Sequence, residues 1–138
     1  MGISFYNSEG YSDPVPYAAI HAIEREDRKR NYRPLVYICS PYAGSEEWNT
    51  MKAREYSRFA VTIGAIPIAP HLLFPQFMDE ATERELAMFM NMVLLGRCAE
   101  LWVFGDRISE GMAAEILRAK QKHMTIRYFT EDYKEVAR

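Results

Sequence analysis

Hydrophobic and polar positions along this chain follow two patterns, short continuous apolar runs and longer segments with helical spacing. Four apolar runs have the length of buried strands, at residues 35–39, 66–69, 99–104 and 125–129. Three segments between them repeat apolar residues every three or four positions, as helices with one buried face do, at residues 45–63, 82–95 and 109–122. This alternation predicts an α/β domain over residues 34–138, a single-domain Rossmann-like or flavodoxin-like parallel sheet flanked by helices.

Small and polar residues mark the expected boundaries of these elements. Ser45 is placed to cap the first helix, and Thr82 with Glu85 has the spacing of a capping box for the second. Pro67 cannot donate to a sheet ladder, so we expect its strand at an edge or at a strand start. Residues 70–80, which are rich in proline, predict a long loop.

The first 33 residues are expected to form an N-terminal extension that packs as an arm on the domain or on a partner subunit. A short helix is expected over residues 17–29. The basic residues between 25 and 33 alternate with acidic ones, which favours a solvated helical face over a site for a polyanion. The extension lacks the charged start and apolar core of a signal peptide, so we expect a cytoplasmic protein.

Composition narrows the classes of partner. The chain has 138 residues and a formal net charge of -2, which argues against nonspecific nucleic-acid binding, and it has no apolar run long enough to span a membrane. Cys39 and Cys98 lie in apolar sequence and are expected as buried reduced thiols. The three histidines are scattered, so we expect no zinc site and no cofactor.

The segment from Trp102 to Ile116 predicts a strand, a turn of small residues and the start of a helix. Ser109 is placed to cap that helix. Glu115 borders the apolar stripe of the helix, which admits two interpretations. It is either a surface glutamate that pairs with Arg118, or a carboxylate that faces a binding site.

Loops at the carboxyl ends of parallel strands meet at one edge of a sheet, where ligands bind. Residues 40–44, 69–74 and 105–111 are therefore expected together. Ser109 and the helix N-terminus form a modest anion site there. Tyr42 and Trp102 are candidates to stack on a base, although Trp102 fits the core better. His71 either contacts a phosphate or base, or hydrogen-bonds the backbone.

The order Ser109-Glu-Gly-Met-Ala-Ala-Glu115 after an apolar strand resembles the motif of the nucleoside 2-deoxyribosyltransferase superfamily. In that superfamily a glycine, three residues and a glutamate open the helix, and the glutamate attacks the anomeric carbon. The resemblance implies that Glu115 is the nucleophile and that Tyr37, on the first strand, orients it. It also implies that sugar or phosphate contacts come from the small-residue loop and the motif, at Ser40, Pro41, Gly44, Gly111 and Met112.

Residues 34–129 more closely resemble a family of small uncharacterised bacterial and phage proteins within that superfamily, of the DUF4406 and DUF7768 type. The resemblance implies cleavage or exchange of the N-glycosidic bond of a (deoxy)nucleoside or nucleoside 5′-monophosphate. The alternative is a nucleotide-binding or sensing module without turnover.

The sequence departs from the superfamily pattern at the acid that would protonate the leaving base. Ser109 stands where the deoxyribosyltransferases carry an aspartate, and a second acid of the family falls near Asn91 or Met92. Asn91 is therefore expected to contact the substrate. Asp106, in preference to Asp79, is the candidate to supply the proton.

Three methionines and Phe89 crowd the helix expected over residues 82–95. Their apolar groups fall on more than one helical face, and a sheet covers only one. They are expected in the core or in a contact between subunits, and we predict a homo-oligomer formed through this helix or the N-terminal extension.

Overall fold

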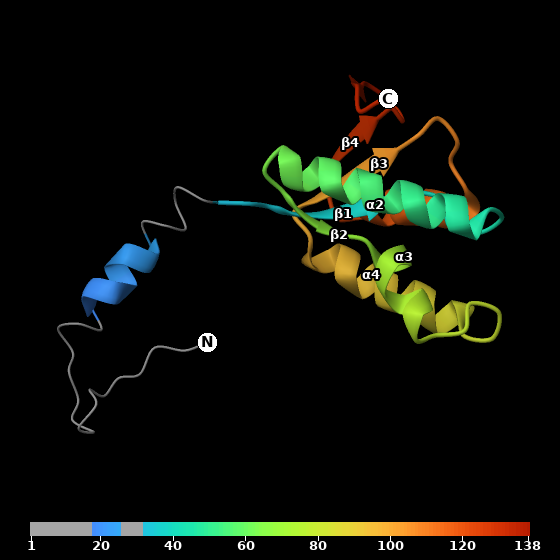
Figure 1. Ribbon diagram of the computed structural model, residues 1–138, viewed down its shortest axis with the longest axis horizontal. Helices are drawn as coiled ribbons and strands as arrows, with labels where there is room; N and C mark the ends of the chain where they lie inside the picture. Colours follow the sequence, from blue (N-terminus) through green and yellow to red (C-terminus); the bar gives the residue numbers. More distant parts are fainter. Residues whose placement is uncertain (1–17, 26–31) are drawn as a thin grey trace. The chain divides into compact units, whose positions relative to one another are not determined.

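A computed structural model of the protein describes residues 18–25 and 32–138 (Figure 1). Residues 18–25 are helical, within the helix expected over 17–29, whose ends lie outside the described residues. Most of the extension, including its expected role as a packing arm, also lies outside them. The α/β unit starts at Arg33, whose guanidinium donates to the carbonyl of Val61 at 3.0 Å.

Within residues 32–138 the structure contains one sheet with the strand order β2-β1-β3-β4-β5. The strands are β1 (Leu35–Cys39), β2 (Ile66–Ile68), β3 (Glu100–Phe104), β4 (Thr125–Phe129) and β5 (Glu135–Val136). All neighbouring strands are parallel except β4 and β5. This order is that of flavodoxin-like doubly wound sheets, so the predicted α/β fold is confirmed. Strand β5 is not predicted by the sequence, since two residues carry no periodicity.

The helices of this unit are α2 (Glu46–Thr62), α3 (Pro70–Leu73), α4 (Arg84–Arg97) and α5 (Glu110–Gln121), with a short 3₁₀ helix η1 (Phe74–Gln76) after α3. The expected loop over residues 70–80 is wrong, because Pro70 begins α3 at a position where its missing N–H costs nothing. Edge placement of β2 is confirmed.

Two capping predictions fail in detail. Ser45 occupies the N-cap of α2, but its side chain accepts no capping hydrogen bond. The capping box of Thr82 and Glu85 does not form, because α4 begins at Arg84 and its N-cap is Glu83. The Glu83 carboxylate instead accepts a hydrogen bond from the Asp79 backbone N–H at 2.9 Å. This bond links the segment before α4 to the N-cap residue.

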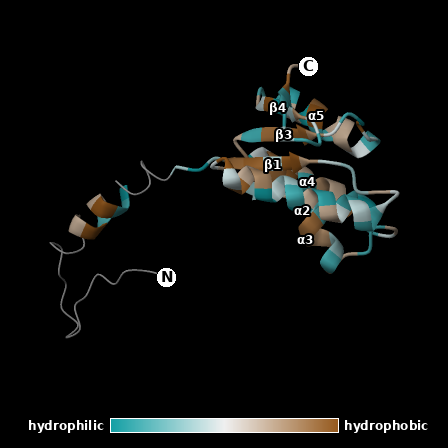
Figure 2. Cartoon of the chain, turned by 45° about the horizontal axis from the view of Figure 1, so that its top comes forward, coloured by the Kyte–Doolittle hydropathy of each residue, from teal (hydrophilic) through white to brown (hydrophobic). Residues whose placement is uncertain are grey.

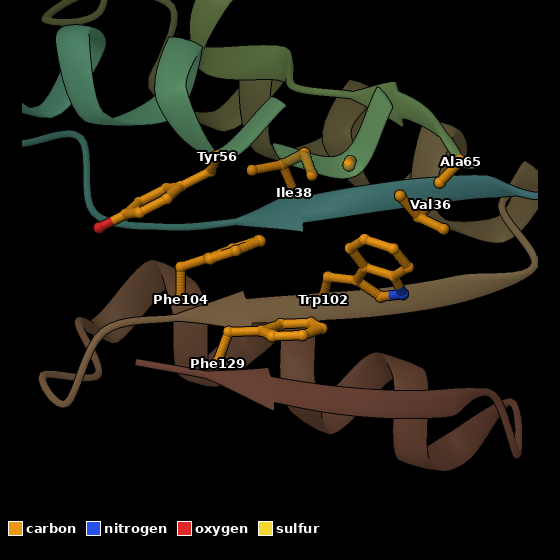
Figure 3. Close-up of a cluster of buried hydrophobic side chains, with 8 residues drawn as sticks. Val36, Ile38, Tyr56, Ala65, Trp102, Phe104 and Phe129 are labelled. Carbon is orange, nitrogen blue, oxygen red and sulfur yellow. The ribbon is translucent and has the colours of Figure 1, made fainter. Parts of the chain in front are cut away.

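One face of the sheet packs against α2 through aromatic rings. Figure 3 shows Tyr56 of α2 over Phe104 of β3, with Trp102 and Phe129 beside them. The Tyr56 and Phe104 rings stack at 4.3 Å between centroids, and Phe129 stacks on Phe104 at 5.2 Å. Burial of each large side chain stabilises the fold by about 1.5–3 kcal/mol. Trp102 is a core residue, as its apolar surroundings favour.

The other face of the sheet packs against α4 and α5. Tyr37 and Cys39 of β1 meet Leu95 of α4 and Met112 of α5 in a second buried cluster, against which Met92 packs. Figure 2 shows apolar residues concentrated in β1 and polar residues along the outside of α2. Since α2 and α5 cover opposite faces, the connection after β1 turns to one face of the sheet and the connection after β3 turns to the other.

The outer side of α4 carries an apolar stripe. Leu86, Phe89 and Val93 follow one another at helical spacing, and Phe89 is 66% exposed. Such a stripe on a helix is unusual unless another surface covers it.

Candidate functional site

The candidate site lies between the carboxyl ends of β1 and β3. Ser40 follows β1 directly and leads to α2, whereas Gly105 follows β3 and leads to α5. The helices after these two neighbouring strands cover opposite faces of the sheet. A crevice opens at such a reversal of connection, which is where ligands bind in open α/β sheets.

Glu115 is buried on the inner side of α5. The Ser109 hydroxyl accepts a bond from the Met112 backbone N–H at 3.2 Å, so the predicted cap of this helix is confirmed. The cap sets the phase of the helix, and Glu115 then faces the sheet with only 3% of its surface exposed. The alternative of a surface pair with Arg118 is wrong, since Arg118 donates to Gln121 instead.

The Tyr37 hydroxyl donates a hydrogen bond to the Glu115 carboxylate, as predicted. Burial raises the pKa of Glu115 from 4.5 to about 7, although donors from Tyr37 and Cys39 act in the opposite direction. Burial also raises the pKa of Tyr37 and of the Cys39 thiol, so both groups keep their protons near neutral pH. Among the described residues, no cation pairs with Glu115.

Glu115 lies at an open pocket of about 220 Å³, which is smaller than the sites of drug-sized ligands. The lining includes eight residues that were predicted from the sequence, which are Ser40, Tyr42, His71, Asn91, Ser109, Gly111, Met112 and Glu115. The Ser40 hydroxyl and the Asn91 side-chain oxygen are buried and have no hydrogen-bond partner. Buried polar atoms are normally paired, so these two atoms make Ser40 and Asn91 candidate ligand contacts.

Tyr42 and His71 stack on one wall of the pocket, with ring centroids 5.0 Å apart. Burial lowers the pKa of His71, although a hydrogen bond to the Ser40 backbone acts in the opposite direction. The imidazole is therefore neutral at pH 7. Of the two alternatives for His71, the backbone hydrogen bond forms, and the ring also lines the pocket.

Four predicted residues lie elsewhere. Pro41 lines a second, smaller cavity of about 40 Å³. Gly44 is not among the residues that line either cavity, and its positive φ of 99° turns the loop. Asp106 is 95% exposed and pairs with Arg138 at 3.6 Å, so its expected place beside Glu115 is wrong. The Asp79 carboxylate accepts from the Ala81 backbone N–H at 2.8 Å.

Several residues of the pocket lining were not predicted from the sequence, namely Ala43, Glu80, Arg84, Ala87, Met88 and Glu110. Three of them share one face of α4 with Asn91, because positions 84, 87, 88 and 91 follow helical spacing. Because Asn91 was already expected in the site, helical spacing from Asn91 was the signal that could have identified these three residues.

The part of the chain that the structure describes contains no cluster of three or more metal-ligating side chains. Over the same residues, no helix has the length and apolar character that crossing a bilayer requires.

Residues 34–129 match the family described as a domain of unknown function, DUF7768. The match covers β1 to β4 and the whole crevice between β1 and β3. The chain therefore belongs to this family. No curated protein matches the sequence.

Proposed function

We propose that this member of the DUF7768 family cleaves or exchanges the N-glycosidic bond of a (deoxy)nucleoside or nucleoside 5′-monophosphate, with Glu115 as the nucleophile. The observation that carries the proposal is a buried glutamate, held by a tyrosine hydroxyl at an open pocket. The resemblance of Gly111, Glu115 and Tyr37 to the nucleoside 2-deoxyribosyltransferase superfamily supports the same chemistry.

The burial of Glu115 carries a desolvation cost that no cationic partner offsets among the described residues. A carboxylate removed from water without a cationic partner destabilises a fold, and an apolar side chain would fill the same place on α5. Strongly perturbed acids in clefts mark functional sites, because poor solvation makes a carboxylate a better nucleophile and a better base. Tyr37 acts as a positioning residue, since its hydroxyl holds Oε2 of the Glu115 carboxylate.

In the proposed reaction, a carboxylate oxygen of Glu115 attacks C1′ of the sugar and the bond from C1′ to the base breaks. The resulting glycosyl ester is then cleaved by water, or by a second base in an exchange. Ser40 and Asn91 supply unpaired polar atoms for the sugar and base. Ser109, the N-terminus of α5 and Arg84 offer contacts for a 5′-phosphate.

The runner-up function is a nucleotide-binding module without turnover. It is favoured by one observation, that the expected acid Asp106 points to solvent, away from the pocket. Leaving bases that need a proton would then bind but depart slowly.

The test is incubation of the protein with a panel of nucleosides, deoxynucleosides and their 5′-monophosphates, with free base measured by chromatography. The Glu115→Gln variant should lose base release by at least about a thousandfold, while it keeps the fold and binds ligand. Glu85→Gln, an exposed change on α4 that does not line the pocket, is the matched control. Saturable binding by calorimetry with no base release from any substrate would favour the binding module instead.

A further inference from the structure

The pocket around Glu115 is acidic. Its lining holds the carboxylates of Glu80, Glu110 and Glu115 against the single guanidinium of Arg84. His71 adds no charge at neutral pH, because its burial lowers the pKa of the imidazole. Opposite charges attract across a few ångströms in a partly desolvated site. The lining therefore favours a ligand that brings positive charge to the reacting centre.

The same lining offers little acid catalysis. Glu110 is exposed and Glu80 is half-buried, so neither lies in the enclosed apolar surroundings typical of a catalytic acid. Asn91 presents an amide, which cannot act as a carboxylic acid. A neutral nucleobase leaves as an anion unless it is protonated, whereas a base that carries a positive charge leaves as a neutral molecule.

We propose that the substrates are nucleosides or nucleotides whose base is a positively charged heteroaromatic ring, such as a pyridinium. This inference rests on the proposed function, since it names the leaving group for attack by Glu115. It accounts for both the acidic lining and the lack, among the described residues, of a second buried acid beside Glu115.

The electrons and atoms balance without an acid. A Glu115 oxygen forms a bond to C1′ while the bond from C1′ to the ring nitrogen breaks, and that electron pair cancels the positive charge of the ring. Water then attacks C1′, the ester bond breaks, and its electrons return to the Glu115 carboxylate. The attacking water loses one proton to solvent, so each turnover releases one neutral base, one sugar and one proton.

The walls of the pocket fit such a ring. Tyr42 and His71 present stacked aromatic faces, and the face of an aromatic ring attracts a cation. A nearby cation also favours the ionised form of Glu115, whose pKa burial has raised. The substrate thus assists the formation of its own nucleophile.

The experiment compares nicotinamide riboside, a pyridinium nucleoside, with uridine and adenosine. The 2′-deoxy form of each nucleoside is tested as well. Base release is followed by chromatography, and proton release by a pH indicator in weak buffer. For each substrate, kcat/KM is divided by the rate constant of the uncatalysed reaction in solution. We expect this enhancement to be more than about a hundredfold greater for the pyridinium substrates than for the neutral ones. One proton should appear per pyridinium base, and all release should stop in Glu115→Gln.

The outcomes separate the two proposals. Release from neutral nucleosides with equal or greater enhancement would overturn the pyridinium inference and leave the proposed N-glycosidic cleavage standing. If no substrate of either kind, including the wider nucleoside panel, releases base, both proposals fail. Release of a pyridinium base that persists in Glu115→Gln would show that the attack does not come from this residue.

Charge removal at the lining provides a second readout. Glu80→Gln and Glu110→Gln should each raise KM for the pyridinium substrate by about two- to fivefold, the effect of one partly solvated charge. The affinity for a neutral competitor, nicotinamide, should stay unchanged, and Glu85→Gln should change neither quantity. Equal losses for charged and neutral ligands would mean that these carboxylates do not recognise charge, and would overturn the inference.

Discussion

Replacement of Glu115 by glutamine should make the protein more stable at alkaline pH, although it removes the proposed nucleophile. The unfolded chain loses the Glu115 proton near 4.5, whereas burial raises the pKa in the folded protein to about 7. Between these values the folded state binds more protons than the unfolded state. Wild-type stability from this group is therefore fully present below about pH 4.5 and is lost as pH rises through about 7.

The expected magnitude follows from the width of that interval. A difference of about 2.5 units corresponds to roughly 3 kcal/mol at 1.36 kcal/mol per unit. Glutamine has nearly the same shape, carries no charge, and keeps an oxygen that accepts from the Tyr37 hydroxyl. The variant should match the wild type near pH 4.5 and exceed its free energy of unfolding by up to about 3 kcal/mol above pH 8.

Urea unfolding of both proteins, monitored by the fluorescence of buried Trp102, measures this difference across the pH range. At typical denaturant slopes, 3 kcal/mol moves the urea midpoint by about 1–3 M. Other titrating groups cancel in the difference between the two proteins. The difference for the exposed control Glu85→Gln should stay flat with pH. If the difference in free energy of unfolding between Glu115→Gln and the wild type is equally independent of pH from about pH 5 to 9, the assignment of a desolvated carboxylate is refuted.

Three further outcomes are expected. Tyr37→Phe removes a donor to Glu115, so the acidic limb of the pH profile of kcat/KM should move upward and the plateau fall about tenfold, which steady-state kinetics would measure. Ser40→Ala removes a buried hydroxyl that has no partner. Thermal unfolding should show stability unchanged within about 1 kcal/mol, whereas calorimetry should show weaker ligand binding. Light scattering should give the mass of a homo-oligomer, and Phe89→Glu on the exposed stripe of α4 should reduce it to a monomer.

The centre of the sheet could be predicted from the sequence because β1 and β3 are buried on both faces. The apolar runs of β1 and β3 coincide with four buried residues each, so continuous hydrophobicity marked them correctly. Helix starts were harder, because several polar residues compete for each cap. Thr82 has favourable spacing to Glu85, but Glu83 occupies the N-cap of α4. The Glu83 carboxylate accepts a hydrogen bond from the Asp79 backbone N–H.

The candidate site was predictable where helical phase determined it. Once Ser109 caps α5, Met112 and Glu115 fall on the same buried side by spacing alone. Spacing alone did not decide between a surface pair of Glu115 with Arg118 and a carboxylate that faces a binding site, and the resemblance to a known motif favoured the binding site. The position of Asn91 depends instead on how α4 packs across β1, a long-range contact with no local signal, whereas helical spacing from Asn91 identifies its neighbours on α4.

The position of Asp106 depends on tertiary contacts that local sequence does not encode. The Gly105 backbone N–H donates to the Phe129 carbonyl at 2.9 Å, and the Gly105 carbonyl accepts from Arg138 at 3.2 Å. Both contacts draw the loop after β3 toward β4 and the end of the chain, whereas Tyr37 holds Glu115 on the side of β1. The carboxylate next to Gly105 consequently meets Arg138 and solvent. The same contacts that complete the sheet thus keep the Asp106 carboxylate away from Glu115, and the leaving group proposed above, which needs no proton, is compatible with that geometry.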